Sequence, residues 1–159
     1  GELRIMFPMI SCLEELHSAK AVLRNAQLEL QQEGIPHRAN VPVGMMIEVP
    51  AAAIMADTFA AEVDFFSIGT NDLTQYTLAA DRGNSKVAHL YNTANPAVCA
   101  LIRHTIEAAH RHGIPCGVCG EAGADPALQP SLIRWGVDEL SMTPSRILPS
   151  RMEISKIRL

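Results

Sequence analysis

The stretch Asp64-Phe-Phe-Ser-Ile-Gly-Thr70 decides the fold, because it is a short, mostly apolar run that ends abruptly in polar residues. A run of this length without strict polar alternation predicts a strand that is buried on both faces. Such strands are typical of parallel sheets covered by helices. Asn71 and Asp72 follow the run directly. The stretch therefore predicts an α/β protein with polar side chains just past the carboxyl end of a strand.

Similar runs lie on both sides of this stretch and alternate with helical patterns. The predicted strands are 4–10, 43–49, 64–70, 114–119 and 139–142, the predicted helices are 11–34, 50–61, 96–113 and 125–136, and a broken helix follows from 144. Residues 71–94 read as a long polar segment. About five strand–helix units predict a parallel sheet, but they are too few to close a barrel of eight. The sheet is therefore either open and doubly wound or the later part of a (β/α)8 barrel.

Composition sets limits on the kind of protein. A chain of 159 residues with 48% hydrophobic and 19% charged residues can bury a substantial core, and we expect one domain over 1–159. A net charge of -4 argues against nucleic-acid binding, and no apolar run is long enough to predict membrane insertion. Four cysteines are too few for a disulfide scaffold in a chain of this size, so we expect a cytoplasmic protein.

Two acidic residues occupy matching places at the ends of neighbouring predicted strands. Glu48 closes the strand 43–49, and Asp72 follows the strand 64–70. Taken alone, Glu48 could pair with an arginine and Asp72 could cap the next helix. Together they suit Mg²⁺, which takes one or two protein carboxylates and completes its shell with water and phosphate oxygens. Arg82 could bind a phosphate or carboxylate beside them, or could be a solvated loop residue.

Cys116 and Cys119 form a Cys-x-x-Cys pair within a predicted strand. Residues three apart on a strand point to opposite faces, so this geometry disfavours a shared metal or a disulfide. Cys116 is then an apolar filler, whereas Cys119 faces the carboxyl end of the strand. Cys119 is a candidate nucleophile or proton donor, and an inert buried cysteine is the alternative. Glu121 could orient this thiol or simply open a helix.

Four segments of the sequence together resemble a known family. They are 43–51, 63–79, 81–84 and 117–121, and they resemble the signature blocks of the phosphoenolpyruvate-binding barrel. Pyruvate phosphate dikinase and phosphoenolpyruvate synthase share this barrel. The stretches 75–78 and 81–84 are more similar to the enzyme I family of the bacterial phosphoenolpyruvate:sugar phosphotransferase system. The resemblance implies that 1–159 is the later part of a (β/α)8 TIM barrel, whose first strands and amino-terminal phosphohistidine domain lie outside this chain.

The resemblance also implies roles for individual residues. Glu48 and Asp72 correspond to the ligands of Mg²⁺, and Asn71 and Asp72 to residues that contact the substrate. Arg82 corresponds to a phosphate-binding arginine. Cys119 corresponds to the acid that protonates the enolate carbon, or removes that proton in the reverse reaction.

The implied activity is a transferase reaction that ends on one protein partner. The phosphoryl group of phosphoenolpyruvate passes to a histidine of the amino-terminal domain, pyruvate is released, and a histidine-containing phosphocarrier protein receives the group to start sugar transport. We expect the isolated chain to be inactive, because that histidine and further arginines are missing, and to form homo-oligomers such as dimers through its exposed sheet edges. The alternatives are a Mg²⁺-dependent carbon–carbon lyase of the same superfamily and a non-catalytic interaction module.

Overall fold

The computed structural model describes residues 2–158 and contains a five-stranded parallel sheet. Its strands are β1 (Ile5–Phe7), β2 (Val43–Ile47), β3 (Phe65–Gly69), β4 (Cys116–Cys119) and β5 (Glu139–Leu140). Each strand pairs in parallel with the one before it, in the order β1-β2-β3-β4-β5. A doubly wound sheet would reverse its strand order at a switch point, so this consecutive order is that of a (β/α)8 barrel. The predicted fold class is confirmed, and the sheet is open.

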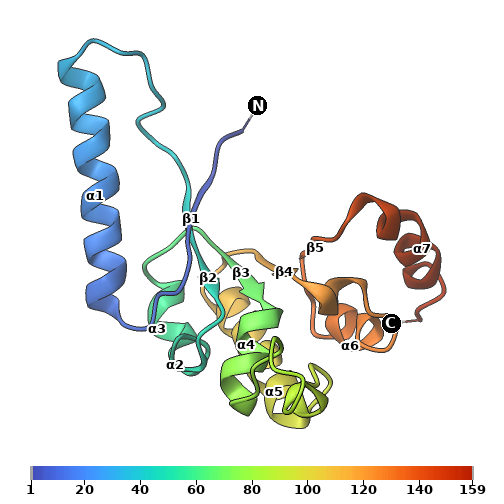
Figure 1. Cartoon of the computed structure of the whole chain (residues 1–159). Coiled ribbons are helices and arrows are strands. Elements are labelled where there is room, and N and C mark those ends of the chain that lie inside the picture. Colours follow the sequence, from blue (N-terminus) through green and yellow to red (C-terminus); the bar gives the residue numbers. More distant parts are fainter. Residues whose placement is uncertain (1, 159) are drawn as a thin grey trace.

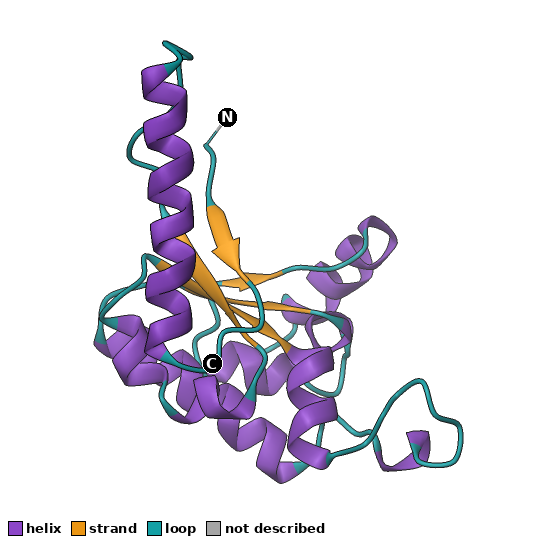
Figure 2. Ribbon diagram, turned by 60° about the vertical axis from the view of Figure 1, so that its left-hand side comes forward, coloured by secondary structure: helices purple, strands orange, loops and turns teal. Residues whose placement is uncertain are grey.

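The helices gather on one side of the strands and at the two sheet edges (Figures 1 and 2). They are α1 (Leu13–Gln32), α2 (Pro50–Ile54), α3 (Ala56–Ala60), α4 (Thr70–Leu78), α5 (Pro96–Arg111), α6 (Gln129–Arg134) and α7 (Pro144–Ile154), with short 3₁₀ turns η1 (Ala88–Leu90) and η2 (Glu121–Ala124). Figure 1 shows α1 beyond the β1 side of the sheet and α7 beyond the β5 side. Within residues 2–158, none of these helices combines the length and hydropathy that crossing a bilayer requires.

The core lies between the sheet and the helices on one of its faces. Alternate strand residues such as Met45, Ile47 and Ile68 are fully buried on the face of the sheet that contacts α2 and α5. Their neighbours on the opposite face, including Met46 and Cys119, are only half-buried and line an open cavity of about 450 Å³. This second face is the inner face of the barrel-type sheet, so side chains at its carboxyl end remain accessible.

The helix boundaries differ from the sequence expectation in three places. The predicted helix 50–61 is divided at Met55, where ψ turns to 19°, so that α2 and α3 both pack on α5. The predicted polar segment 71–94 contains most of α4, which sequence patterning missed because two of its buried residues are Thr70 and Thr74. The helix expected from 125 begins at Gln129, after the turn η2.

Candidate functional site

The ends of three neighbouring strands lie side by side at one rim of the sheet. Ile47 pairs with Ile68, so the next residues, Glu48 and Gly69, are level with each other. Gly69 in turn pairs with Cys119. Neighbouring strands are about 4.8 Å apart, so Glu48 and Cys119 are separated by about two strand spacings. The structure therefore brings the predicted acid and the predicted thiol to the same edge.

Glu48 is a buried carboxylate with few partners. It is 4% exposed, and its Oε1 accepts a hydrogen bond of 2.8 Å from the backbone amide of Met9. Among residues 2–158 it forms no ion pair with an arginine, so the structural alternative considered for Glu48 is wrong. Burial raises the pKa of Glu48, the Met9 amide opposes this effect, and the negative charge of Asp72 adds to it. A cation would stabilise the ionised form.

Gly69 gives the Glu48 side chain the space that it occupies. A Cβ at position 69 would lie 2.7 Å from Glu48 Oε2 and 2.9 Å from Met46 Sδ. Real side chains do not approach so closely, so the carboxylate depends on a glycine at this strand end. The Gly69-Thr70-Asn71 turn then starts α4 directly beneath the rim.

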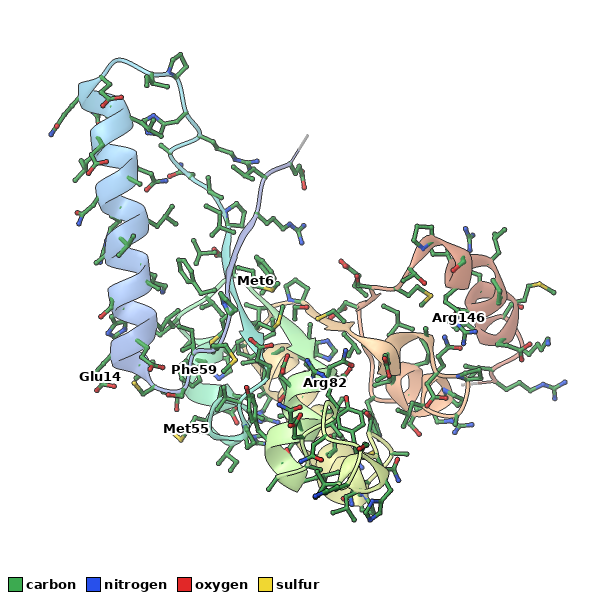
Figure 3. All side chains as sticks on the ribbon, viewed as in Figure 1. Met6, Glu14, Met55, Phe59, Arg82 and Arg146 are labelled. Carbon is green, nitrogen blue, oxygen red and sulfur yellow. The ribbon has the colours of Figure 1, made fainter. Side chains whose placement is uncertain are left out.

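Asp72, on the helix that leaves this rim, forms an ion pair with Arg82 in the loop that follows the helix. Asp72 lies in the first turn of α4, and its Oδ1 is 3.2 Å from Arg82 Nη1. The Arg82 backbone amide donates to Gln75 Oε1, which holds the returning loop against the helix. Within residues 2–158, the Asp72 side chain makes no cap hydrogen bond to α4. Arg82 is an exposed turn residue whose guanidinium pairs with Asp72. Figure 3 shows Arg82 near the carboxyl ends of the strands.

Asn71 connects α4 with the loop after β4. Its Oδ1 accepts a hydrogen bond of 3.1 Å from the Glu121 amide, and its carbonyl accepts one of 3.2 Å from the Tyr91 hydroxyl. Gly120 permits this contact, since its φ is +94° and a Cβ there would lie 2.9 Å from Asn71 Oδ1. Glu121 itself is exposed and begins η2, so it acts on the rim here through its backbone.

The two cysteines of the Cys-x-x-Cys pair face opposite sides of β4, as predicted. Cys116 is fully buried on the helix side, and burial raises the pKa of its thiol well above the usual value. Cys119 is half-buried on the inner face, and its thiol donates to the Ile68 carbonyl at 3.4 Å. All four cysteines are free thiols. Of the pair, Cys119 alone is placed for chemistry at the rim.

Two cavities flank this rim. The first, of about 590 Å³, lies beyond β4 and β5 and is lined by residues including Tyr91, Glu121 and Arg146. The second, of about 450 Å³, runs along the inner face of the sheet and includes Cys119 and Met46. Arg146, on α7, lies away from Arg82 (Figure 3). Of the predicted site residues, Cys119 lines the second cavity, and Glu121 lines the first.

The donor set at this rim fits Mg²⁺ through two carboxylates. Within the described range 2–158, no group of three or more His, Cys, Asp and Glu side chains is arranged to hold a metal. Glu48 and Asp72 provide oxygen donors, and they repel each other without a cation between them. Two protein carboxylates are sufficient for Mg²⁺ when water and phosphate oxygens complete its shell. Glu48 and Asp72 are therefore the groups that could hold it.

Sequence reasoning missed three contributors to this site. Met9 donates its amide to Glu48, Thr70 Oγ1 donates to the Cys119 carbonyl at 2.9 Å, and Tyr91 donates to the Asn71 carbonyl. These bonds connect residues at least 20 positions apart, so local patterns do not reveal them. The Pro8-Met9 step was the one available signal, because proline often precedes a turn residue with positive φ.

Comparison with known sequences gives consistent results over the whole chain. A family model described as PEP-utilising enzyme, PEP-binding domain, matches residues 1–159. Phosphoenolpyruvate-protein phosphotransferase of Geobacillus stearothermophilus is 54% identical over 157 residues, which is 99% of this chain and 27% of that protein. The protein of the same name from Bacillus subtilis (strain 168) is 50% identical, over 99% of this chain and 28% of its own length. The chain thus spans about a quarter of these relatives.

Comparison with solved structures supports the fold. A citrate lyase from Burkholderia xenovorans LB400 superposes with a TM-score of 0.66 over 95% of this chain and 48% of that chain. The two sequences are 18% identical, so this likeness concerns the arrangement of strands and helices.

Proposed function

Since this chain belongs to the family of PEP-binding domains of PEP-utilising enzymes, we propose that it forms the phosphoenolpyruvate site of a phosphoenolpyruvate-protein phosphotransferase. The observation that carries this proposal is the meeting of Glu48, Asp72 and Cys119 at one rim of the sheet. A pair of carboxylates, a guanidinium and a thiol match what the reaction needs, namely a cation site, an anion site and a proton donor.

The first step of the proposed reaction transfers a phosphoryl group. Arg82 would exchange the Asp72 carboxylate for oxygens of the substrate, which leaves Asp72 and Glu48 free for Mg²⁺. Bound Mg²⁺ would offset the charge on the phosphate and on the developing enolate. Asn71 would contact the substrate from the start of α4. The bond between phosphorus and the enol oxygen breaks, a bond to a histidine nitrogen forms, and the enolate of pyruvate remains.

The second step moves one proton. The Cys119 thiol gives its proton to the methylene carbon of the enolate, which becomes the methyl group of pyruvate, and the thiolate recovers a proton from water. In the reverse direction the thiolate removes that proton. The accessible inner face beside Cys119 leaves room for the enolate.

The remaining parts of the proposal concern partners outside this chain. We assign the acceptor histidine and the further phosphate-binding arginines to residues outside 1–159, and a histidine-containing phosphocarrier protein to the next transfer in sugar transport. The four free thiols favour a cytoplasmic setting. The open edges at β1 and β5 favour association with a second copy.

A chimera tests the proposal directly. This chain replaces the matching 157 residues of the Geobacillus stearothermophilus relative, and phosphohistidine and pyruvate are measured after phosphoenolpyruvate is added. We expect both products from the chimera and neither from the 159-residue chain alone. Pyruvate without phosphohistidine, or no reaction in the folded chimera, would contradict the proposal.

The cysteine pair supplies a matched control within this chimera. Cys119→Ala should slow turnover by about 100-fold or more, because the proton donor is lost. Binding of Mn²⁺, used as a spectroscopic substitute for Mg²⁺, should persist in this variant. Cys116→Ala removes the same thiol from the opposite face of β4 and should leave turnover nearly unchanged. Equal rates in the two variants would remove Cys119 from its assigned role.

A further inference from the structure

The turn after β1 has an unusual backbone conformation. Met9 has a φ of 56° and, with Ala79, is one of two non-glycine residues with positive φ among residues 2–158. Residues with a Cβ disfavour this left-handed region. The Met9 side chain is 49% exposed, so burial of the side chain does not hold the turn in place.

The turn is instead tied to Glu48. The Met9 amide donates a hydrogen bond of 2.8 Å to Glu48 Oε1, across 39 positions of sequence. Within residues 2–158, no other hydrogen bond reaches the Glu48 side chain. The Met9 N–H lies in the peptide plane that it shares with Pro8, and the φ of Met9 sets the direction in which the chain continues from that plane to Ile10.

This bond makes the two oxygens of Glu48 different. Oε1 is held by β1, and Oε2 lies over Gly69, 2.7 Å from the position of an added Cβ. Gly69 is the strand neighbour of Cys119 and immediately precedes α4, which carries Asp72. Oε2 thus lies over the end of β3, between β2 and the elements that carry Cys119 and Asp72.

We propose that the Met9 amide is a positioning group that holds Glu48 Oε1 and so reserves Oε2 for the divalent cation. The inference rests on the proposed function only for the statement that Glu48 binds the metal. Ligating carboxylates are commonly oriented by a hydrogen bond to their second oxygen, and losing such a partner weakens metal binding. The αL conformation of Met9 then lets the chain continue to the buried Ile10 while the Met9 amide stays bonded to Glu48.

A series of substitutions at position 9 separates backbone conformation from side chain. Met9→Gly and Met9→Asn tolerate positive φ, whereas Met9→Val does not. Mn²⁺ binding to the chimera, followed by electron paramagnetic resonance of the free ion, should stay within about twofold for Gly and Asn and weaken about tenfold for Val. Equal affinity across the series, or equal loss in all three variants, would overturn the inference.

A backbone ester at position 9 covers the case in which the valine variant does not fold. Replacing the Met9 amide by an ester through an α-hydroxy acid removes the N–H donor and keeps the side chain. We expect Mn²⁺ affinity to fall about tenfold, with a smaller Mn²⁺-induced rise of the unfolding midpoint. Unchanged affinity would overturn the positioning role.

The reference variant Glu48→Gln distinguishes this inference from the proposed function. If Glu48→Gln leaves Mn²⁺ binding intact, then the metal role of Glu48 fails. If Glu48→Gln abolishes binding but the ester and Val variants bind normally, then only the positioning role of Met9 fails. The unfolding midpoint of each variant, measured with a chelator present so that no metal is bound, shows how much the substitution itself destabilises the fold.

Discussion

The two ends of the sheet use carboxylates in opposite ways. At the amino ends, an aspartate that precedes one strand accepts a hydrogen bond from the first backbone amide of the neighbouring strand. Asp64 Oδ2 accepts from the Val43 amide at 2.7 Å, and Asp138 Oδ2 accepts from the Cys116 amide at 2.8 Å. At the carboxyl ends, Glu48 accepts a single amide, and its other oxygen lies free of protein donors within residues 2–158. The aspartates at the amino ends thus use their carboxylates to fix neighbouring strands, whereas one oxygen of Glu48 at the carboxyl ends remains available to a ligand.

The pKa shifts follow this difference. Burial acts to raise the pKa of Asp138, but the Cys116 amide and His110 outweigh it, so the pKa of Asp138 lies below its ordinary value. For Glu48, burial dominates and the pKa is raised. The surroundings thus stabilise the charged form of Asp138 at the amino ends and destabilise the charged form of Glu48 at the carboxyl ends. Barrel enzymes place stability at the amino ends of their strands and chemistry at the carboxyl ends, and the role that we propose for Glu48 follows this division.

The largest expected effect comes from Glu48→Gln. Removing the charge should lower phosphotransfer by the chimera by about 1,000-fold, because the cation that offsets substrate charge is lost. The folded-state pKa of Glu48 is raised, so its ionisation costs stability increasingly as pH rises from the ordinary value of a glutamate through the folded value. At pH 8 the variant should therefore unfold at the same temperature as the parent or higher. A clear loss of stability at pH 8, or normal turnover, would contradict the contrast between the two rims.

Gly120→Ala has the next largest effect. A Cβ at position 120 would lie 2.6 Å from Thr70 Oγ1, in a backbone with a φ of +94°, so we expect a loss of about 2 to 3 kcal/mol in the free energy of unfolding. Gly113→Ala is the matched control near the amino ends, with a φ of +71° and no atom within 4 Å of the added Cβ. It should cost about 1 kcal/mol, from backbone strain alone. Equal costs in urea denaturation would show that the contact with Thr70 is not tight.

Asp138→Ala tests the clamp at the amino ends. Loss of the bonds to Cys116 and His110 should lower the free energy of unfolding by about 1 to 2 kcal/mol at pH 7. The Asp138 side chain is 45% exposed, so solvent screens the ionic share. Because its folded pKa is depressed, the stabilisation is present above the ordinary aspartate pKa of about 4 and disappears as pH falls through the folded value.

The difference between parent and Asp138→Ala should accordingly shrink in denaturation series below about pH 4. Turnover per folded molecule of the chimera should not change, since Asp138 lies at the opposite end of the sheet from the rim. A reduced turnover with unchanged stability would assign Asp138 to the reaction and break the contrast between the rims.

The sequence predicted the strands, and the positions of Glu48 and Cys119 at their carboxyl ends, for a physical reason. Buried parallel strands are continuous apolar runs, so a polar residue such as Glu48 at the end of one is conspicuous. The family resemblance seen in the motifs is confirmed by the match over residues 1–159. The opposite orientations of Cys116 and Cys119 also followed from strand geometry and are confirmed.

Other features were not accessible from local patterns. The first turns of α4 bury threonines, so its sequence reads as a polar loop. The bond from Met9 to Glu48 spans 39 positions and depends on a positive φ at Met9, which the preceding Pro8 alone does not specify. The pairing of Arg82 with Asp72 depends on the chain turning back after α4. Sequence therefore indicated which residues reach the rim, and the structure showed what orients them.

The smallest expected effect is at Ala79, the second residue with positive φ. Ala79 ends α4 with a φ of 49° and turns the chain so that Arg82 returns to Asp72. Ala79→Gly relieves the strain of a Cβ in this region but makes the unfolded chain more flexible, so the net gain should be about 0.5 to 1 kcal/mol in urea denaturation. Because the turn itself is kept, Mn²⁺ binding by the chimera should not change. Ala79→Gly could instead weaken Mn²⁺ binding as Met9→Val is expected to. Binding would then depend on the backbone near the rim in general, and the loss in Met9→Val could not be attributed to the hydrogen bond between the Met9 amide and Glu48.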